Sequence, residues 1–140
     1  MPCTSPWLRR SIESPGVVSN RGEHEGLREP AVASVDRNRD AVVVTLAGEL
    51  DLYNAHEVRD ALLDECEREP KRLVVDLSRV AFIDSTALGV LIEARAKLAN
   101  HRAFLLAAPA VETRRTFEIS GLDRHFTLHE SLDEALAARL

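Results

Sequence analysis

Cysteine is scarce in this 140-residue chain, whose only two cysteines are Cys3 and Cys66. They lie far apart and lack the Cys-x-x-Cys spacing that is typical of zinc and redox sites. The sequence also has no secretory leader pattern and no apolar run long enough to cross a bilayer. We therefore expect a cytoplasmic protein that does not enter membranes, with Cys66 buried on one side of a helix as a small apolar residue.

The motifs of common catalytic and cofactor sites are missing as well. No Gly-x-Ser-x-Gly elbow and no glycine-rich phosphate loop occurs, and no histidine is tied to a serine by its position. His125 and His129 are four residues apart, but this spacing builds a metal pair only on a helix, and the segment between them is typical of a strand. We therefore expect no catalytic residue, no metal, no cofactor, and a protein that is not an enzyme.

Positive charge is not in excess either. The formal net charge is −5, and the arginines and glutamates of residues 1–30 balance, so the whole negative excess belongs to residues 31–140. An acidic domain without a basic stripe is a poor ligand for nucleic acid, because such binding relies on neutralising phosphates. A protein partner is the better expectation.

The length suits one domain with a hydrophobic core of its own. Residues 1–29 mix Pro, Ser, Gly, Arg and Glu without a sustained period, which predicts a mostly disordered arm. Residues 30–140 have regular apolar patterns and form the predicted domain.

Strands and helices alternate from residue 31 onward. The strands are expected over 31–36, 41–47, 72–77, 103–107 and 126–129, and a polar turn over 37–40 joins the first two. Helices are expected over 54–68 with Asn54 as the cap, over 85–99, between Pro109 and Gly121, and after the capping box Ser131-x-x-Glu134. The order predicts an α/β fold: one mixed sheet with an N-terminal hairpin, parallel β-α-β crossovers and about four helices.

The most informative stretch is Asp84-Ser85-Thr86, which lies between a buried strand and an amphipathic helix. Before it, residues 73–77 form a β-branched apolar run, as in strands that are covered on both faces. After it, apolar residues recur with the period of one helical face, at Ala87, Leu91, Ala94 and Leu98. Either Asp84 or Ser85 can supply an N-cap oxygen, so the spacing alone allows a purely structural role.

A second side of the same helix is small and apolar next to the Ser85 hydroxyl. It carries Ser85, Leu88, Gly89, Ile92 and Ala96. Such a surface suits the close approach of another protein, although Leu88 and Ile92 could equally pack against neighbouring helices.

Three segments together carry a family resemblance. Residues 82–91 contain Asp-Ser-Thr-Ala-Leu-Gly, residues 46–52 contain Gly-Glu-Leu-Asp, and residues 108–122 run from Ala-Pro to Gly-Leu across a late helix. In this order they resemble the signature, the early turn and the late helix of the STAS domain of bacterial anti-sigma factor antagonists. One departure is Ala87, where the family usually has glycine. The resemblance implies a single STAS domain.

The resemblance also implies a partner-switching role. Proteins of this family bind an anti-sigma factor, usually a serine kinase of the histidine-kinase-like ATPase fold, and thereby release a sigma factor. The kinase phosphorylates the serine that matches Ser85, for which Thr86 is the alternative acceptor here, and a metal-dependent serine phosphatase reverses the step. ATP and metal belong to those enzymes.

The expected partner-binding residues follow from the resemblance and from the second side of the helix: Asp51, Asp84, Ser85, Thr86, Leu88, Gly89 and Ile92. Asp51 could instead be an ordinary turn residue. The alternative function is a STAS scaffold that is not phosphorylated and serves as a regulatory subunit of a transport or signalling complex.

Overall fold

The computed structural model describes residues 30–140, and the predictions made for residues 1–29 lie outside this range. This range contains two short 3-10 turns, η1 (His101–Ala103) and η2 (Leu122–Arg124). In chain order, the strands and helices are β1 (Val32–Arg37), β2 (Val42–Leu50), α2 (Ala55–Glu67), β3 (Leu73–Ile83), α3 (Ser85–Lys97), β4 (Phe104–Ala107), α4 (Val111–Ser120), β5 (Thr127–His129) and α5 (Leu132–Ala137).

The strands form one mixed sheet in the order β1-β2-β3-β4-β5. β1 and β2 are an antiparallel hairpin, and each later strand runs parallel to the one before it. The hairpin turn is closed by the side chain of Asn38, whose Oδ1 accepts hydrogen bonds from the backbone N–H groups of Asp40 (2.7 Å) and Ala41 (2.9 Å). The predicted α/β fold, with its hairpin, parallel crossovers and four helices within residues 30–140, is confirmed.

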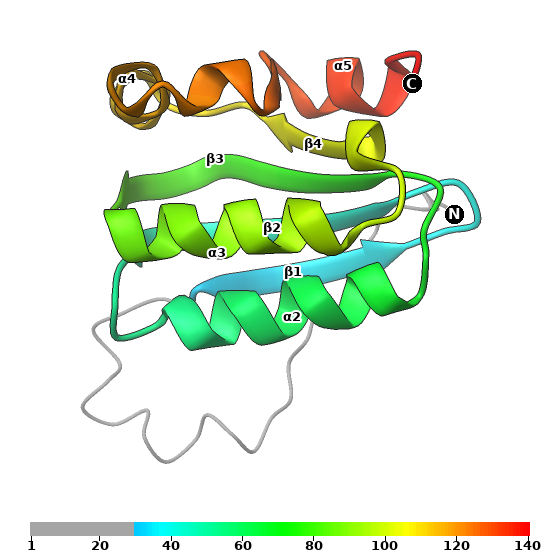
Figure 1. Cartoon of the computed structure of the whole chain (residues 1–140), viewed down its shortest axis with the longest axis horizontal. Coiled ribbons are helices and arrows are strands. Elements are labelled where there is room, and N and C mark those ends of the chain that lie inside the picture. The colour runs from blue at the N-terminus through cyan, green and yellow to red at the C-terminus, as the bar shows by residue number, and fades with distance from the viewer. Residues whose placement is uncertain (1–29) are drawn as a thin grey trace, which may run out of the picture.

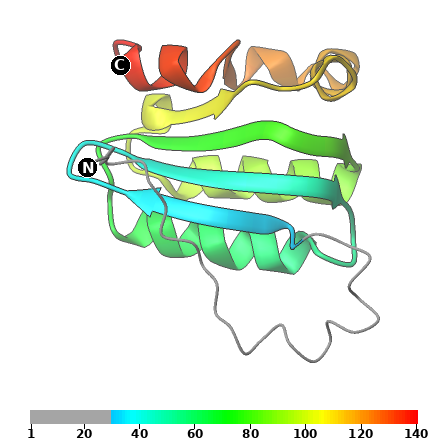
Figure 2. The same cartoon turned by 180° about the vertical axis from the view of Figure 1, so that it is seen from behind.

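Helices cover one face of β1, β2 and β3, and α5 packs against β3 and β4 on the opposite face. α2 and α3 lie side by side over one face (Figure 1), and the view from behind shows the other face of β1, β2 and β3 (Figure 2). Val75 of β3 joins the large core with α2, α3 and α4, whereas Val74 joins a smaller cluster with Ala135 of α5. Burial on both faces explains the continuous apolar run of β3.

β2 and β3 extend further than predicted, to Leu50 and Ile83 instead of residues 47 and 77. Their pairing shifts register at two places, between Thr45 and Ala47 and again after Gly48. Gly48 has a φ of 79°, which glycine adopts at little cost, and bulges of this kind disturb the alternation of side chains. The strand ends predicted from the sequence pattern were therefore too early. Their added length carries the chain to the edge of the sheet where α2 and α3 begin.

The later helices follow the predicted signals with small shifts. α4 begins at Val111 instead of Pro109 and ends at Gly121, whose φ of 78° is the left-handed conformation of a glycine cap. The Oγ of Ser131 accepts a hydrogen bond from the N–H of Glu134 (3.1 Å), which confirms the N-terminal cap of α5. The Glu134 carboxylate accepts from the N–H of Glu130 (3.1 Å), so the box closes one residue upstream of its usual place.

Cys66 lies on the buried stripe of α2, as predicted, and its Sγ donates to the carbonyl oxygen of Ala94 (3.4 Å). Burial, with a smaller contribution from the negative charge of Glu65, raises the pKa of the Cys66 thiol to about 11. At pH 8 the thiol of the folded protein is therefore protonated. Because the thiolate is the reactive form, Cys66 is then unreactive.

We expect iodoacetamide to modify Cys66 slowly at pH 8 and faster as the pH rises toward 11. The measurement is the alkylation rate by mass spectrometry in a Cys3→Ser variant, where Cys66 is the only thiol. In urea the pKa returns to about 8.5 and alkylation becomes rapid. Rapid alkylation of the folded protein at pH 8 contradicts the assigned burial.

The hairpin is tied to α2 by a buried carboxylate. Glu65 is 2% exposed, and its two oxygens accept hydrogen bonds from Nε (3.0 Å) and Nη2 (2.6 Å) of Arg37. The Glu65 carboxylate is the first cause of the raised pKa of the Arg37 guanidinium. Removing the arginine leaves a buried acceptor without its main donor.

We expect Arg37→Ala to lower the free energy of unfolding by about 1–2 kcal/mol, the lower part of the range for an unsatisfied buried group, because Arg37 is half exposed and water screens the pair. Urea denaturation measures the change. Arg39→Ala removes the same charge from the exposed turn and serves as the control; equal stability of the two variants contradicts the expectation.

Candidate functional site

Two loops meet at the carboxyl ends of β2 and β3. Leu50 and Ile83 are register partners at the ends of these strands, and the backbone N–H of Asp84 donates to the carbonyl oxygen of Leu50 (3.0 Å). Asp51 and Asp84, the residues that follow these two strands, therefore lie close together, as the family resemblance implied. The turn after β2 and the start of α3 lie at the same end of the molecule (Figure 1).

The carboxylate of Asp84 caps α3. Asp84 is extended (φ −101°, ψ 179°), and its Oδ1 accepts a hydrogen bond from the N–H of Ala87 (3.0 Å). This settles which of the two candidate residues makes the cap, because Ser85 is already the first residue of the helix. Ser85 and Thr86 are both exposed. The Ser85 side chain is therefore exposed and does not serve as the cap.

Asp51 and Asn54 organise the turn before α2. The Oδ1 of Asp51 accepts from the N–H of Tyr53 (3.0 Å), and the Oδ1 of Asn54 accepts from the N–H of Asp51 (2.9 Å). The side-chain amide of Asn54 also donates to the carbonyl oxygen of Glu49 (2.8 Å). Asn54 occupies the N-cap position of α2 as predicted, but its side chain makes no capping hydrogen bond, because its two polar atoms bond Asp51 and Glu49 within the turn. Asp51 thus has the turn role that the sequence left open beside partner binding.

The outward side of α3 differs from the predicted surface at one residue. Gly89 and Ile92 are exposed, Ile92 by 44%, and an added Cβ at Gly89 would meet no atom within 4 Å. Leu88 is only 6% exposed and packs in the core, so its place on the predicted partner surface is a wrong prediction of exposure. Leu88 lies on the flank of α3 next to the helix's main buried face, and the core extends far enough to cover this flank.

Ala87 is 1% exposed and faces the core. Its methyl group therefore points away from the outward side of α3. The helical conformation at this position accommodates a Cβ without backbone strain.

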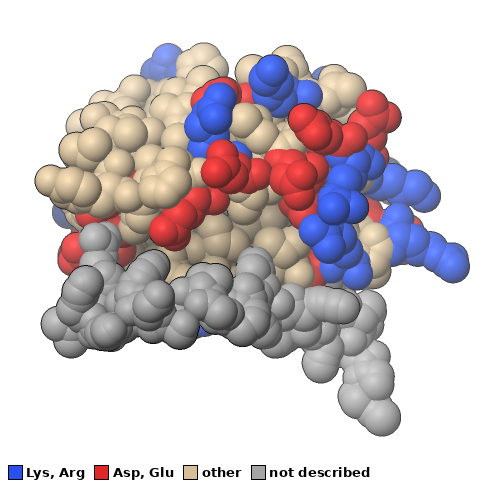
Figure 3. All heavy atoms as spheres, turned by 90° about the horizontal axis from the view of Figure 1, so that it is seen from below, with Lys and Arg blue, Asp and Glu red and all other residues tan. Residues whose placement is uncertain are grey.

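Sequence reasoning missed three large apolar side chains near this site. Leu52 and Tyr53, in the turn before α2, are 61% and 75% exposed, and Phe82, at the end of β3, is 52% exposed. Figure 3 shows uncharged atoms gathered at the end where α2 and α3 begin, with most of the visible Lys and Arg toward the opposite end. The available signal was two adjacent apolar residues inside a turn, where polar residues are usual.

An ion pair joins the two helices beside the site. The Nε and Nη2 of Arg59 on α2 donate to the carboxylate oxygens of Glu93 on α3, at 2.9 and 2.8 Å. The hydrogen bond to Arg59 lowers the pKa of the Glu93 carboxyl and raises that of Arg59. The pair spans the exposed side of the two helices, about two turns along α3 from Ser85.

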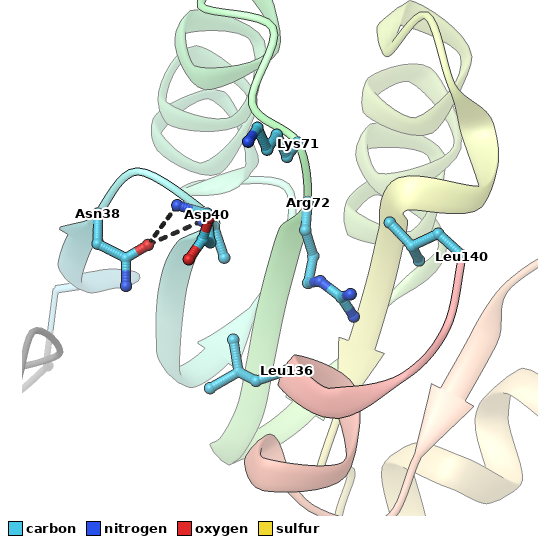
Figure 4. Close-up of a pocket in the computed structure, with 7 residues that line it drawn as sticks. Asn38, Asp40, Lys71, Arg72, Leu136 and Leu140 are labelled. Carbon is cyan, nitrogen blue, oxygen red and sulfur yellow. Dashed lines mark hydrogen bonds between the residues drawn. The ribbon is translucent and has the colours of Figure 1, made fainter.

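A pocket of about 560 Å³ lies at the opposite end of the sheet, where β2 and β3 begin (Figure 4). Arg72 in its wall donates from Nη1 and Nη2 to the carbonyl oxygens of Ala135 (2.6 Å) and Ala138 (2.7 Å), so it fastens the end of α5. The pocket shares no residue with the site at Ser85.

The described residues hold no group of three or more His, Cys, Asp or Glu side chains that could bind a metal ion. His129 lies in β5 and His125 precedes it outside any α-helix, so the two do not form a helical pair. Between residues 30 and 140, no helix combines the length and apolar character needed to span a membrane.

Comparison with known proteins relates both the sequence and the fold to one family. The STAS domain model matches residues 32–135. The anti-sigma-F factor antagonist RsfB of Mycobacterium tuberculosis is 34% identical over 105 residues, which cover 75% of this chain and 85% of that protein. The anti-sigma-B factor antagonist of Listeria monocytogenes is 36% identical over 88 residues, covering 62% of this chain and 77% of that protein.

The crystal structure of an anti-sigma factor antagonist from Mycobacterium paratuberculosis superposes with a TM-score of 0.68 at 34% sequence identity. It covers 73% of this chain and 87% of the other. The matched region includes the whole sheet, the turn before α2 and the start of α3. The chain therefore belongs to the STAS domain family.

Proposed function

We propose that this protein is an anti-sigma factor antagonist that binds an anti-sigma factor with serine kinase activity while Ser85 is unphosphorylated, and so releases a sigma factor. Phosphorylation of Ser85 ends the interaction, and a serine phosphatase restores it. The names of its relatives support the general role. The observation that carries the switch is the exposed Ser85 at the first position of α3, with Asp84 already serving as the cap.

The surface around Ser85 suits a protein partner. It combines exposed apolar side chains with the bare backbone at Gly89, and uncharged atoms dominate this end of the molecule (Figure 3). Interfaces of this kind are centred on desolvated apolar contacts and exclude charge from the middle of the patch. Asp84 contributes to this surface indirectly, because its carboxylate caps α3 and so holds the backbone around Ser85 in place.

Phosphorylation changes this surface without opposing the fold. The new group adds a charge of about −1.5 to −2, which the N–H groups and dipole at a helix N-terminus favour. The partner must desolvate the same charge, next to the carboxylate of Asp84, and this is costly in an apolar contact. The modification therefore acts on binding while the domain remains folded.

The phosphorylation site is tested by incubating the protein with its kinase and ATP, followed by intact-mass and peptide-level mass spectrometry. We expect one phosphate, on Ser85, and none in Ser85→Ala. Thr86→Ala is the matched control, because Thr86 is also exposed and is adjacent in sequence. A phosphate found on Thr86 in the native protein would contradict the assignment to Ser85 and identify Thr86 as the phosphorylated residue.

An unmodified protein, beside a kinase that is active on another substrate, supports the alternative of a STAS scaffold and rejects the switch. The kinase is identified by a pull-down with the Ser85→Ala protein, which keeps the unphosphorylated surface.

A further inference from the structure

We propose that Leu52 and Tyr53 form a second anchor for the anti-sigma factor and determine which anti-sigma factor this protein selects. The inference rests on the proposed function and adds to it residues outside α3, the helix that carries Ser85. The surface formed by these two side chains is called the turn anchor below.

The turn anchor is held rigidly although it is exposed. The Asp51 carboxylate accepts a hydrogen bond from the N–H of Tyr53. The Asn54 side chain accepts one from the N–H of Asp51 and donates one to the carbonyl oxygen of Glu49, and all three bonds measure between 2.8 and 3.0 Å. Three hydrogen bonds thus fix the backbone beneath two large apolar side chains that are 61% and 75% exposed. A backbone that is already ordered loses little conformational entropy on binding, which favours the use of this turn as an anchor.

The position of the turn anchor determines its occupant. The hydrogen bond between the N–H of Asp84 and the carbonyl of Leu50 places this turn directly beside the start of α3, where Ser85 lies. A partner large enough to cover Ser85 and Gly89 therefore reaches the turn anchor as part of one continuous surface. A standard interface buries about 800 Å² on each partner, much more than the start of one helix supplies.

The chemistry of the two side chains defines the complementary surface. Tyrosine is enriched among residues that dominate binding energy, because it buries a large ring and keeps a polar hydroxyl for one hydrogen bond. Leu52 requires an apolar neighbour. We infer an apolar recess on the anti-sigma factor with a hydrogen-bond partner at its rim, which rejects related antagonists that carry polar residues at this turn.

The experiment compares Leu52→Ala, Tyr53→Ala and the double variant with Ile119→Ala. Ile119 is 80% exposed on α4 and is the matched control for removing an exposed apolar side chain. We expect Tyr53→Ala to weaken binding of the anti-sigma factor captured by the Ser85→Ala protein by about tenfold or more, with a larger loss in the double variant. Ile119→Ala leaves the affinity unchanged, and all four retain the melting temperature of the native protein, as exposed positions do.

Phosphorylation kinetics supply a second readout that altered folding would not mimic. Because the turn anchor touches the kinase away from the acceptor hydroxyl, its loss raises KM for this protein and leaves kcat unchanged. Native affinity and native KM in the double variant overturn the inference and leave the proposed function intact. Failure of the native protein to bind any anti-sigma factor overturns both.

Discussion

Ser85→Asp weakens binding to the anti-sigma factor by about 10- to 100-fold, whereas Ser85→Ala binds as tightly as the unphosphorylated protein or more tightly. The aspartate adds one negative charge at the start of α3, where the contact is apolar and Asp84 is adjacent. The helix itself tolerates the change, since acidic residues are favoured in its first turn. Isothermal titration calorimetry with the purified anti-sigma factor measures the effect.

Ser85→Asn is the control for this result. Asparagine has nearly the shape of aspartate and no charge, so it separates electrostatic exclusion from loss of space. We expect Asn to weaken binding much less than Asp. Equal affinities of the Asp and Asn variants, with both folded by circular dichroism, contradict a switch that acts through charge.

Gly89→Leu raises the stability of the domain and at the same time disrupts partner binding. Gly89 is exposed, and an added Cβ there meets open space, so a larger side chain can extend from this position toward solvent. Leucine is a better helix former than glycine, and we expect the free energy of unfolding to rise by about 0.5–1 kcal/mol. On the partner side, a side chain now stands where the backbone was bare, and we expect affinity to fall by roughly tenfold or more.

Ala96→Leu is the matched control, because Ala96 is also exposed on α3 but lies seven residues further from Ser85. It adds a similar side chain away from the contact. Urea denaturation and calorimetry of both variants separate the two effects. A Gly89→Leu protein that binds normally excludes close approach of the partner to α3 at this turn.

The order of elements was readable from local patterns because each pattern reports one physical requirement. The period at Ala87, Leu91 and Ala94 reports one buried helix face, and all three residues are buried. Ser131 and Gly121 satisfy helix-end groups locally, so their roles did not depend on distant residues. The limits of β2 and β3 were misjudged because bulges around Gly48 remove the alternation on which a pattern depends.

The site was readable only in part. Asp84 and Ser85 were located, but which of them caps α3 depends on backbone angles that the sequence leaves open. Leu88 was placed on the surface because helical spacing does not say how wide a stripe the neighbouring elements cover. Leu52 and Tyr53 went unnoticed because the exposure of an apolar side chain is a property of the packed molecule.

The residues alone were sufficient to place a hydroxyl at the junction of a buried strand and a helix, since capping and periodicity act over a few neighbouring positions. Packing decided what surrounds that hydroxyl. The pairing of Leu50 with Ile83 brings together two turns that are more than thirty residues apart in the chain, and with them the exposed turn before α2 and the start of α3. Such long-range adjacency arises from the hydrogen bonding of the sheet, which no local pattern contains.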